Sequence, residues 1–370
     1  MSVPKTTNQW TVEGLDGFDS LKYNKDVPIP ELGTGQVLVK SMPVNFIFDM
    51  LCAVTDTTPV QGASLNYRDL IIPKGQYPFP IANSFVPGSD GAGTVLATGP
   101  NTHPFAPGDK VLTLFNQAHL GGSLDATSLA SGLGGARDGT FRQHAVFAED
   151  GLVRMPAGLN FVEAATLTCA GLTAWNALHG LAGRQVKPGD WVLMQGTGGV
   201  SLFAVQFAKA AGARVISTTG SGAKVGLLES LGADHVVNYK EVPEWGRRAK
   251  ELAGGRGCDH VVEVAGPVSM QQSLDAVAID GVISIIGFLG GGKADKEPSF
   301  LAALTSICTV RGILVGSRVQ MEDMCRAVEA NVEKLRPVVD DKVFSLEELK
   351  EAYEYMWDQK HTGKVCIKIE

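Results

Sequence analysis

Short β-branched runs alternate with amphipathic stretches from residue 190 to about residue 315 of the chain. The intervening stretches SLFAVQFAKAAGA and AKVGLLESLGA carry apolar residues at helical spacing and end at Gly or Gly-Ala. Six strands that alternate with helices form a parallel sheet covered by helices on both faces, so the pattern predicts a doubly wound α/β fold. The predicted strands are 191–195, 214–218, 235–239, 260–265, 281–287 and 310–315.

The first 155 residues or so have a different pattern, with short alternating strands such as QVLVK, GAGTVLATG, DKVLTLF and RQHAVF among Pro and Gly. This pattern predicts a mainly β domain. After the parallel sheet we predict a helix from Met321, a second helix whose capping box joins Ser345 to Glu348, and a last strand KVCIKI that returns to the β domain. The expected domains are 1–160 with 318–370, and 161–317.

Composition narrows the class of protein. The chain has 370 residues, of which 44% are hydrophobic and 19% charged, and its net charge is −7. This is the profile of a globular protein without general affinity for nucleic acid or anionic membranes. The N-terminus lacks a secretion pattern and no apolar run approaches bilayer length, so we expect a cytoplasmic protein. The six cysteines form no C-x-x-C pair, which argues against a disulfide framework or a cysteine-rich zinc lobe.

The 44 glycines include a turn that suits a phosphate. The strand 191–195 runs directly into GTGGVS and then into a helix, as in dinucleotide-binding sheets of the Rossmann kind. Gly196 permits the tight turn, and Gly198 lets the backbone approach a pyrophosphate. The N-terminus of the helix that follows offers unpaired N–H groups and a positive dipole end. A glycine turn without a ligand is the alternative.

The end of the second strand bears on the cofactor. An Asp or Glu there would accept the ribose hydroxyl of NAD, but this stretch reads STTGSGAK, with Ser221 neutral and Lys224 the nearest cation. We therefore predict NADP(H). The alternative for Lys224 is an exposed residue in the first turn of a helix.

Several motifs together resemble the medium-chain dehydrogenase/reductase superfamily: ASLNYRDLIIPKGQYP, VPGSDGAGTV, AATLTCAGLTAWNAL, QGTGGVSLFAVQFAKAAGA, LGADHVVNY and HTGKVCIKI. Within it the chain is most similar to the zinc-independent, quinone oxidoreductase-like branch, close to fungal zinc-type alcohol dehydrogenase-like proteins. The resemblance implies a GroES-like, mainly β catalytic domain, an inserted Rossmann domain, a nicotinamide cofactor and a homodimer.

The resemblance also assigns roles by position. It implies that Thr173 lies near the nicotinamide and that the glycine turn holds the pyrophosphate. Turn or packing roles are the alternative, above all for Gly266 and Gly287. The implied cofactor-binding residues are Thr173, Gly196, Gly198, Gly199, Val200, Ser221, Lys224, Tyr239, Gly266, Gly287 and Phe288.

The zinc ligands of zinc-dependent relatives are largely missing. Asn66 stands where those relatives have Cys, and Ser89-Asp90 where they have His-Glu, so that Cys169 alone remains. One thiolate cannot hold a catalytic zinc, which takes about three protein ligands. The segment 115–139 contains no cysteine for a structural zinc, and His119 and His144 lie too far apart in the sequence to form a recognisable site. We predict catalysis without a metal.

Without a Lewis acid, an α,β-unsaturated carbonyl or a quinone is an easier substrate than an unactivated alcohol. Asn66, Tyr67 and Tyr77 fall where the resembled branch lines its substrate cleft, and we predict that they bind the carbonyl and donate a proton. The alternative for each tyrosine is a buried ring with a bonded hydroxyl. We expect Arg68 and Asp69 to pair with each other or with nearby backbone. The alternative functions are an NAD(P)-dependent alcohol dehydrogenase and a non-enzymatic nucleotide-binding relative.

The segment 41–62 does not fit the resemblance, because the strand GQVLVK normally leads almost directly into ASLNYRD. Its many apolar residues are unlike an ordinary exposed loop. Two explanations stay open: a non-native insertion, such as a translated intron, and a packed lineage-specific loop.

Overall fold

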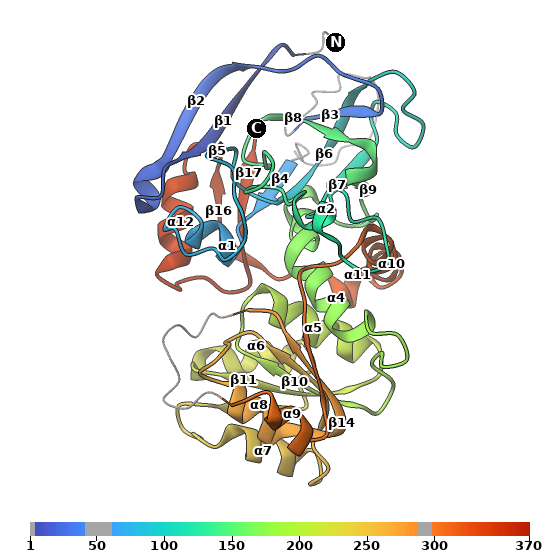
Figure 1. Cartoon of the computed structure of the whole chain (residues 1–370), viewed down its shortest axis with the longest axis vertical. Coiled ribbons are helices and arrows are strands. Elements are labelled where there is room, and N and C mark those ends of the chain that lie inside the picture. Colours follow the sequence, from blue (N-terminus) through green and yellow to red (C-terminus); the bar gives the residue numbers. More distant parts are fainter. Residues whose placement is uncertain (1–3, 41–60, 288–297) are drawn as a thin grey trace, which may run out of the picture. The chain divides into compact units, whose positions relative to one another are not determined.

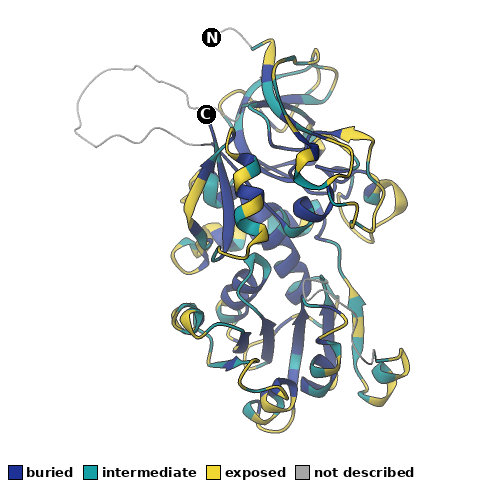
Figure 2. Cartoon of the chain, turned by 90° about the vertical axis from the view of Figure 1, so that its left-hand side faces the viewer, coloured by how far each residue is buried: buried dark blue, intermediate teal, exposed yellow. Residues whose placement is uncertain are grey.

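The computed structural model describes residues 4–40, 61–287 and 298–370. The chain forms two compact units (Figure 1). The first unit consists of Met1–Cys169, Ser317–Val332 and Val339–Glu370, and the second of Ala170–Gly316 and Glu333–Val338. In each unit the central strands are largely buried, whereas exposed residues lie on outer helices, loops and edge strands (Figure 2). Phe288 and residues 41–60 lie outside the described residues.

A six-stranded sheet forms the centre of the second unit. Its order is β12-β11-β10-β13-β14-β15 and all neighbours are parallel, which confirms the predicted doubly wound sheet. All five residues of β10 are buried, as expected for a central strand covered on both faces. The strands are β10 (Trp191–Gln195), β11 (Arg214–Thr219), β12 (His235–Asn238), β13 (Cys258–Glu263), β14 (Val277–Ile285) and β15 (Thr309–Gly312).

Helices follow these strands where apolar spacing predicts them, and α5 packs against β10 and β11. Strand β14 differs from the prediction, since it begins at Val277 rather than at residue 281. Asp280, with φ of 64°, and Gly281 interrupt the apolar run, although pairing with β13 continues around them. The helices are α4 (Leu172–His179), α5 (Gly199–Ala210), α6 (Val225–Ser230), α7 (Trp245–Leu252), α8 (Met270–Ala276) and α9 (Leu301–Thr305).

The first unit is mainly β. Its larger sheet has the order β16-β17-β4-β6-β3-β8, with β7 paired to β6 and β9, and a smaller sheet has the order β2-β1-β5. The closing strand β17 pairs with β4 and β16, so the chain returns to this unit as expected. The strands are β1 (Thr6–Glu13), β2 (Leu21–Pro28), β3 (Gln36–Lys40), β4 (Gln61–Ser64), β5 (Ser84–Phe85), β6 (Asp90–Thr98), β7 (Lys110–Thr113), β8 (His144–Ala148), β9 (Leu152–Arg154), β16 (Val339–Ser345) and β17 (Lys364–Ile369).

Short helices cover this sheet, and α12 contributes the fully buried Tyr353 to an apolar core that also holds Trp10, Phe141 and Phe344. A 2.8 Å hydrogen bond runs from the backbone N–H of Ser345 to the Glu348 carboxylate, which is one half of the predicted capping box. The helix itself begins later than predicted, at Leu349, with Glu348 as its N-cap. The helices are α1 (Tyr67–Ile71), α2 (Ala126–Leu129), α3 (Phe161–Ala165), α10 (Arg318–Ala330) and α12 (Leu349–Trp357), and α11 (Val332–Leu335) lies at a boundary of the units.

Two residues of the segment 41–62 belong to the sheet. Gln61 and Gly62 are the first residues of β4 and pair with Ile369 and Lys368 of β17. A side chain at Gly62 would meet the backbone of Val162 at 2.6 Å, so this strand requires glycine there. The segment that does not fit the resemblance is therefore shorter than predicted by at least these two residues. None of the helices in the described part of the chain combines the length and apolar character that a membrane crossing requires.

Candidate active site

Asn66 lies at the point where β4 gives way to α1 in the first unit. It precedes the first residue of α1 with an extended backbone, as an N-cap residue does. The backbone N–H of Asn66 donates to Oδ2 of Asp69 at 2.8 Å, which fixes the start of the helix. The side chain of Asn66 is 9% exposed. A strand, a cap and a helix therefore hold this amide in a buried position.

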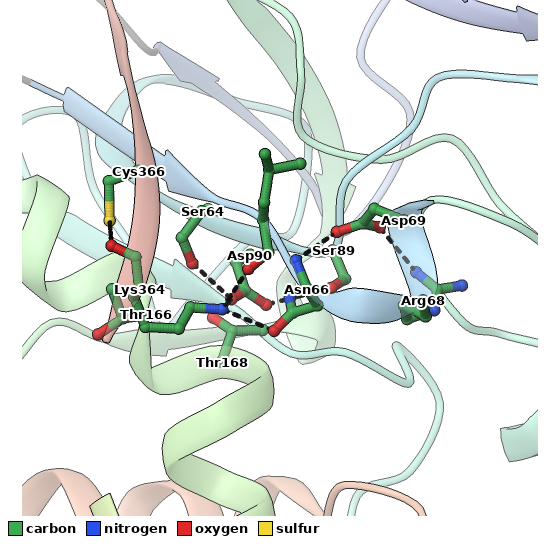
Figure 3. Close-up of polar contacts among 12 residues, drawn as sticks. Ser64, Asn66, Arg68, Asp69, Ser89, Asp90, Thr166, Thr168, Lys364 and Cys366 are labelled. Atoms are coloured by element: carbon green, nitrogen blue, oxygen red, sulfur yellow. Dashed lines mark hydrogen bonds and ion pairs between the residues drawn. The ribbon is translucent and has the colours of Figure 1, made fainter. Parts of the chain in front are cut away.

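A buried ammonium group lies against the Asn66 side chain (Figure 3). Nζ of Lys364, from β17, donates to Oδ1 of Asn66 at 2.6 Å and to the carbonyl oxygen of Leu65 at 2.6 Å. It also lies 3.1 Å from Oδ2 of Asp90, on β6. Lys364 is 4% exposed and Asp90 is fully buried, so the two charges compensate each other out of water.

Two hydroxyls complete the shell around Asp90 (Figure 3). Ser64 donates to Oδ2 at 2.6 Å and Ser89 donates to Oδ1 at 3.1 Å. Nδ2 of Asn66 lies 3.4 Å from the Ser89 hydroxyl, which is a long contact. Asn66, Ser89 and Asp90, singled out in the sequence for their place in the family motifs, thus form one buried cluster.

Tyr77 joins this region through Arg68. Nε of Arg68 donates to the Tyr77 hydroxyl at 3.3 Å, and Nη1 donates to the carbonyl oxygen of Leu133 at 2.8 Å. Arg68 also lies 3.6 Å from Oδ1 of Asp69, so the predicted pairing of these neighbours is confirmed. Burial raises the pKa of Asp69 to about 6, although Arg68 and the backbone bond from Asn66 act in the opposite direction.

Tyr67 has a different environment. Its ring stacks on that of Trp357, the last residue of α12, with centroids 6.5 Å apart and an interplanar angle of 7°. The ring also packs against the apolar core of the first unit. The Tyr67 ring therefore has an evident packing role, as does the ring of Tyr77, which packs against the same core and lies edge-on to Phe79 with centroids 5.4 Å apart.

Cys169 lies near the same charges, since those of Asp90 and Lys364 act on its thiol. Burial, with the carboxylate of Asp90 adding to it, raises the pKa of Cys169 to about 12, which keeps the thiol protonated. Within the described ranges, no group of three or more His, Cys, Asp or Glu residues is arranged to hold a metal ion. His119 and His144 are both buried, and Nε2 of His119 lies 3.1 Å from the carbonyl oxygen of Gly122.

In the second unit the glycine turn has the form that a pyrophosphate needs. Gly196 has φ of 74°, and its N–H donates to the carbonyl oxygen of Thr218 at 2.9 Å. Gly198 caps α5, whose first residues are Gly199 and Val200. A side chain at Gly196 or Gly198 would meet no atom within 4 Å, so there is open space above the turn. This space and the helix N-terminus fit the diphosphate of a dinucleotide.

The residues predicted around the adenosine phosphate lie together at the ends of β11 and β12. The N–H of Tyr239 donates to the carbonyl oxygen of Thr219 at 3.0 Å, and the N–H of Lys224 donates to that of Ser221 at 3.2 Å. The Tyr239 hydroxyl lies over Gly220, where a Cβ atom would approach it to 2.3 Å. Hydroxyls and one cation thus surround this end of β11, and they fit a phosphate.

The remaining cofactor candidates are less closely grouped. Thr173 lies in α4 and is 3% exposed, and Gly287 follows β14. Gly266, with φ of 86°, is a turn residue whose N–H donates to Oε1 of Glu263 at 2.9 Å. The predicted roles of these residues stay predictions, and Phe288 lies outside the described residues.

Sequence reasoning missed two buried charges, Lys364 and Glu263. Glu263 ends β13, and its carboxylate accepts hydrogen bonds from backbone and side-chain donors on either side of the turn. Among these donors is Gln195, the last residue of β10, at 2.7 Å. Glu263 therefore ties two strand ends together beside the glycine turn. A charged residue at the end or start of an apolar strand was the available clue in both cases.

A Rossmann sheet with an open glycine turn, together with a β unit that holds a buried polar cluster, defines a two-domain dehydrogenase or reductase. The model of the alcohol dehydrogenase GroES-like domain matches residues 58–157, and that of the zinc-binding dehydrogenase family matches residues 199–330. A zinc-type alcohol dehydrogenase-like protein of Schizosaccharomyces pombe is 44% identical over 358 residues, which cover 96% of this chain and 97% of the relative.

Solved structures agree with this class. The structure of a putative alcohol dehydrogenase from Sinorhizobium meliloti matches with a TM-score of 0.84 and 37% identity, covering 99% of this chain and 100% of the other. That of an NAD-dependent alcohol dehydrogenase matches with a TM-score of 0.81 and 31% identity, covering 98% and 100%. The chain belongs to the medium-chain dehydrogenase/reductase superfamily, as its motifs predicted, and is an oxidoreductase of that superfamily.

Proposed function

We propose that this protein is an NADPH-dependent, zinc-independent reductase that transfers hydride to a quinone or an α,β-unsaturated carbonyl. One observation carries this proposal: the Lys364 ammonium is bonded to Asn66 and Asp90, two of the positions that correspond to the zinc-binding motifs of zinc-dependent relatives. A positive charge and a zinc ion would compete for the same oxygen atoms.

The donor set itself does not fit zinc. Zinc sites in proteins use thiolates, imidazoles and carboxylates. Here an amide replaces the expected thiolate at Asn66, and a hydroxyl replaces the imidazole at Ser89. The remaining thiol, Cys169, has a pKa of about 12 and would have to lose its proton to bind zinc. Without a Lewis acid the hydroxyl of an alcohol is not activated, which favours a substrate that already carries a carbonyl.

The first unit offers two donors for such a carbonyl. Nδ2 of Asn66 is held beside Ser89 and can donate to the substrate oxygen, where negative charge builds up as hydride arrives. The Tyr77 oxygen accepts from Arg68, which leaves the phenolic O–H to be donated. The reduced nicotinamide supplies the hydride. When hydride adds to the β-carbon of an enone, the electron pair moves onto oxygen as an enolate, and a proton from Tyr77 or water then reaches the α-carbon.

The preference for NADP(H) rests on the end of β11. Ser221 and Tyr239 supply hydroxyls there and Lys224 supplies positive charge, whereas the buried Thr219 hydroxyl is bonded to the Ser221 backbone. The stretch 217–224 contains no carboxylate to accept a ribose hydroxyl. A 2′-phosphate would find donors and no repelling charge. The same residues would accept NAD more weakly, because the phosphate contacts would be lost.

We propose that two copies of the chain form a homodimer along the edge of the parallel sheet. Strand β15 is the last strand of this sheet, and no other described strand pairs with its outer side. Large apolar side chains near it are exposed, among them Leu304 at 69% and Ile307 at 58%. An exposed strand edge with apolar neighbours favours pairing with a second copy of the chain.

A panel of quinones, enones and alcohols, each assayed with both nicotinamide cofactors, tests the proposal. We expect turnover of enones or quinones with NADPH and little oxidation of simple alcohols. Efficient oxidation of an alcohol with NAD as cofactor would instead support the alcohol dehydrogenase alternative, in keeping with the names of several relatives. Binding of NADPH without turnover of any substrate would favour the non-enzymatic alternative.

A further inference from the structure

We propose that Lys364 is a positioning residue that fixes the amide of Asn66 so that its nitrogen, rather than its oxygen, faces the substrate. The proposal deepens the carbonyl reductase function and rests on it for its catalytic consequence. Its structural part concerns two residues of the first unit, on β17 and at the start of α1.

The donors of the Lys364 ammonium match the acceptors around it. A lysine ammonium has three donors and no acceptor. Nζ of Lys364 lies 2.6 Å from the Leu65 carbonyl oxygen, 2.6 Å from Oδ1 of Asn66 and 3.1 Å from Oδ2 of Asp90. Each donor is therefore used, and the ammonium has no further donor for a substrate. Lys364 would act through Asn66 rather than on the reacting carbonyl itself.

The ammonium favours one orientation of the amide, which the capping box of α1, with the Asn66 side chain facing the backbone N–H of Asp69, also favours. If the Asn66 side chain were flipped, its NH2 group would face the Lys364 ammonium, and two donors would meet without an acceptor. The observed orientation instead gives the short bond from Nζ to Oδ1. Nδ2 is then directed away from Lys364, with Ser89 at 3.4 Å as its partner among the described residues. An amide nitrogen carries two hydrogens, so this contact leaves one N–H for a ligand.

This orientation suits an oxygen that gains negative charge. A donor already aimed at that oxygen needs no reorganisation when hydride arrives, whereas an amide oxygen in its place would repel the developing enolate. The positive charge on the Oδ1 side also polarises the amide and strengthens its N–H as a donor.

Asp90 has the supporting role of keeping Lys364 in place. Its carboxylate binds the ammonium through Oδ2 and also accepts from Ser64 and Ser89. A fully buried carboxylate with these partners holds its charge, and this charge in turn holds Lys364 against Asn66. The three side chains therefore act in series: Asp90 holds Lys364, and Lys364 orients Asn66.

A double-mutant cycle tests the proposal. We expect Lys364→Met to lower kcat for the reducible carbonyl about 10- to 100-fold, at or below the lower end of the roughly 10²- to 10³-fold loss caused by removing an oxyanion donor, because the amide is misoriented rather than removed. The KM for NADPH should change little. In the background of Asn66→Ala, the same Lys364→Met change should cause no further loss, because the residue through which Lys364 acts is already gone. If the double variant shows the full loss of both single variants combined, the two residues act independently and the proposal is overturned.

Three further variants separate positioning from folding. Lys364→Met leaves Asp90 buried without its partner, so Lys364→Met with Asp90→Asn removes both charges and should fold while still lacking the ordered amide. Lys364→Arg keeps a cation and should restore part of the activity. Lys368→Met changes a half-buried lysine of the same strand, whose ammonium pairs with Glu370, and should leave kcat unchanged. Activity near that of the wild type in the folded double variant would contradict the proposal.

A readout without catalysis separates this proposal from the proposed function. In nitrogen-labelled protein, the Asn66 side-chain NH2 resonances are assigned by their loss in Asn66→Ala. We expect them to shift in Lys364→Met and to stay in place in Lys368→Met. Unmoved Asn66 resonances in Lys364→Met would overturn the positioning role, even in an active enzyme. If the Asn66 resonances shift in Lys364→Met but the wild-type protein reduces neither quinones nor enones, the proposed function alone is refuted.

Discussion

Nε of Arg68 lies 3.3 Å from the hydroxyl oxygen of Tyr77, nine residues further along the chain. A guanidinium only donates, so this contact occupies an acceptor position of the phenol and leaves its own proton for another partner. Arg68 thus prepares Tyr77 to act as a donor while its own charge stays paired with Asp69.

Tyr77→Phe should therefore lower kcat for enone reduction by up to about 10²-fold, the lower part of the range for a positioned proton donor, since water can supply the proton in its absence. Tyr67→Phe should cause a smaller loss, because the ring that stacks on Trp357 is retained. The measurement is steady-state kinetics with a saturating concentration of NADPH.

Tyr23→Phe provides the control, since its hydroxyl bonds to Glu347 and has no part in the site. If the phenol transfers the proton, the solvent isotope effect on kcat should be larger in the wild type than in Tyr77→Phe. Equal losses from Tyr77→Phe and Tyr23→Phe would exclude Tyr77 as the donor.

The purified enzyme should be active without zinc. Because Lys364 already neutralises Asp90 and the Cys169 thiol keeps its proton, removal of metal takes nothing from the site. Elemental analysis should show zinc well below one atom per chain, and incubation with a strong chelator should leave kcat unchanged. One zinc per chain, lost together with activity on chelation, would refute this prediction.

The doubly wound class and the six strands of the parallel sheet were predictable from the sequence, because hydrophobic period is a local property. Apolar runs placed the six strands of the parallel sheet, and the closing strand 364–369 was predicted with the bounds of β17. The centre of the site was not predictable in the same way. Lys364 and Asp90 are 274 residues apart, and nothing in the local pattern indicates that one buries its charge against the other.

Two other differences between the sequence-based predictions and the structure have local causes. The beginning of β14 was missed because Asp280 adopts a positive φ inside the strand, which a pattern of alternating residues does not anticipate. Glu263 was missed because its donors include Gln195, which lies 68 residues away in the sequence, besides those in the segment 265–273. The sequence identified Asn66, Ser89 and Asp90 through motifs, but their arrangement around one ammonium required the fold.

Lys224→Ala should weaken NADPH binding by roughly tenfold while changing the KM for NADH little. The physical reason is the loss of one charge-assisted contact to the 2′-phosphate, which is worth about 1.5 kcal/mol. Lys187→Ala is a matched control, because this exposed lysine precedes β10 and lies at the end of the sheet away from the glycine turn. Cofactor titrations followed by nicotinamide fluorescence measure both variants. An equal effect of Lys224→Ala on NADH and NADPH would contradict the phosphate contact.

The wild-type protein should behave as a dimer of twice 39.1 kDa, about 78 kDa, in light scattering. Val310→Lys places a charge on the exposed edge strand β15 and should shift the population to monomer, because an edge lysine opposes strand pairing. Val343→Lys, at a similarly exposed valine of β16, is the control. A monomeric wild-type protein, or a dimer that Val310→Lys leaves intact, would rule out this interface.

Asp69 should make stability depend on pH. Burial raises its pKa from 3.8 to about 6, so between these values the folded chain keeps a proton that the unfolded chain has released. Stability from this group is then fully present at low pH and is lost as pH rises through about 6. A shift of this size corresponds to about 3 kcal/mol in the free energy of unfolding. Above about pH 7 the contribution is constant.

Asp69→Asn isolates this contribution, because the amide keeps an acceptor for the backbone N–H of Asn66 but does not titrate. Urea unfolding at a series of pH values gives the difference in stability between wild type and variant. As pH rises from about 4 to about 7, the wild type should lose stability relative to the variant, since ionisation leaves a carboxylate whose burial Arg68, at 3.6 Å, offsets in part only. A wild type that gains stability over this interval would show instead that Arg68 and the backbone bond outweigh burial, with the pKa of Asp69 below its ordinary value.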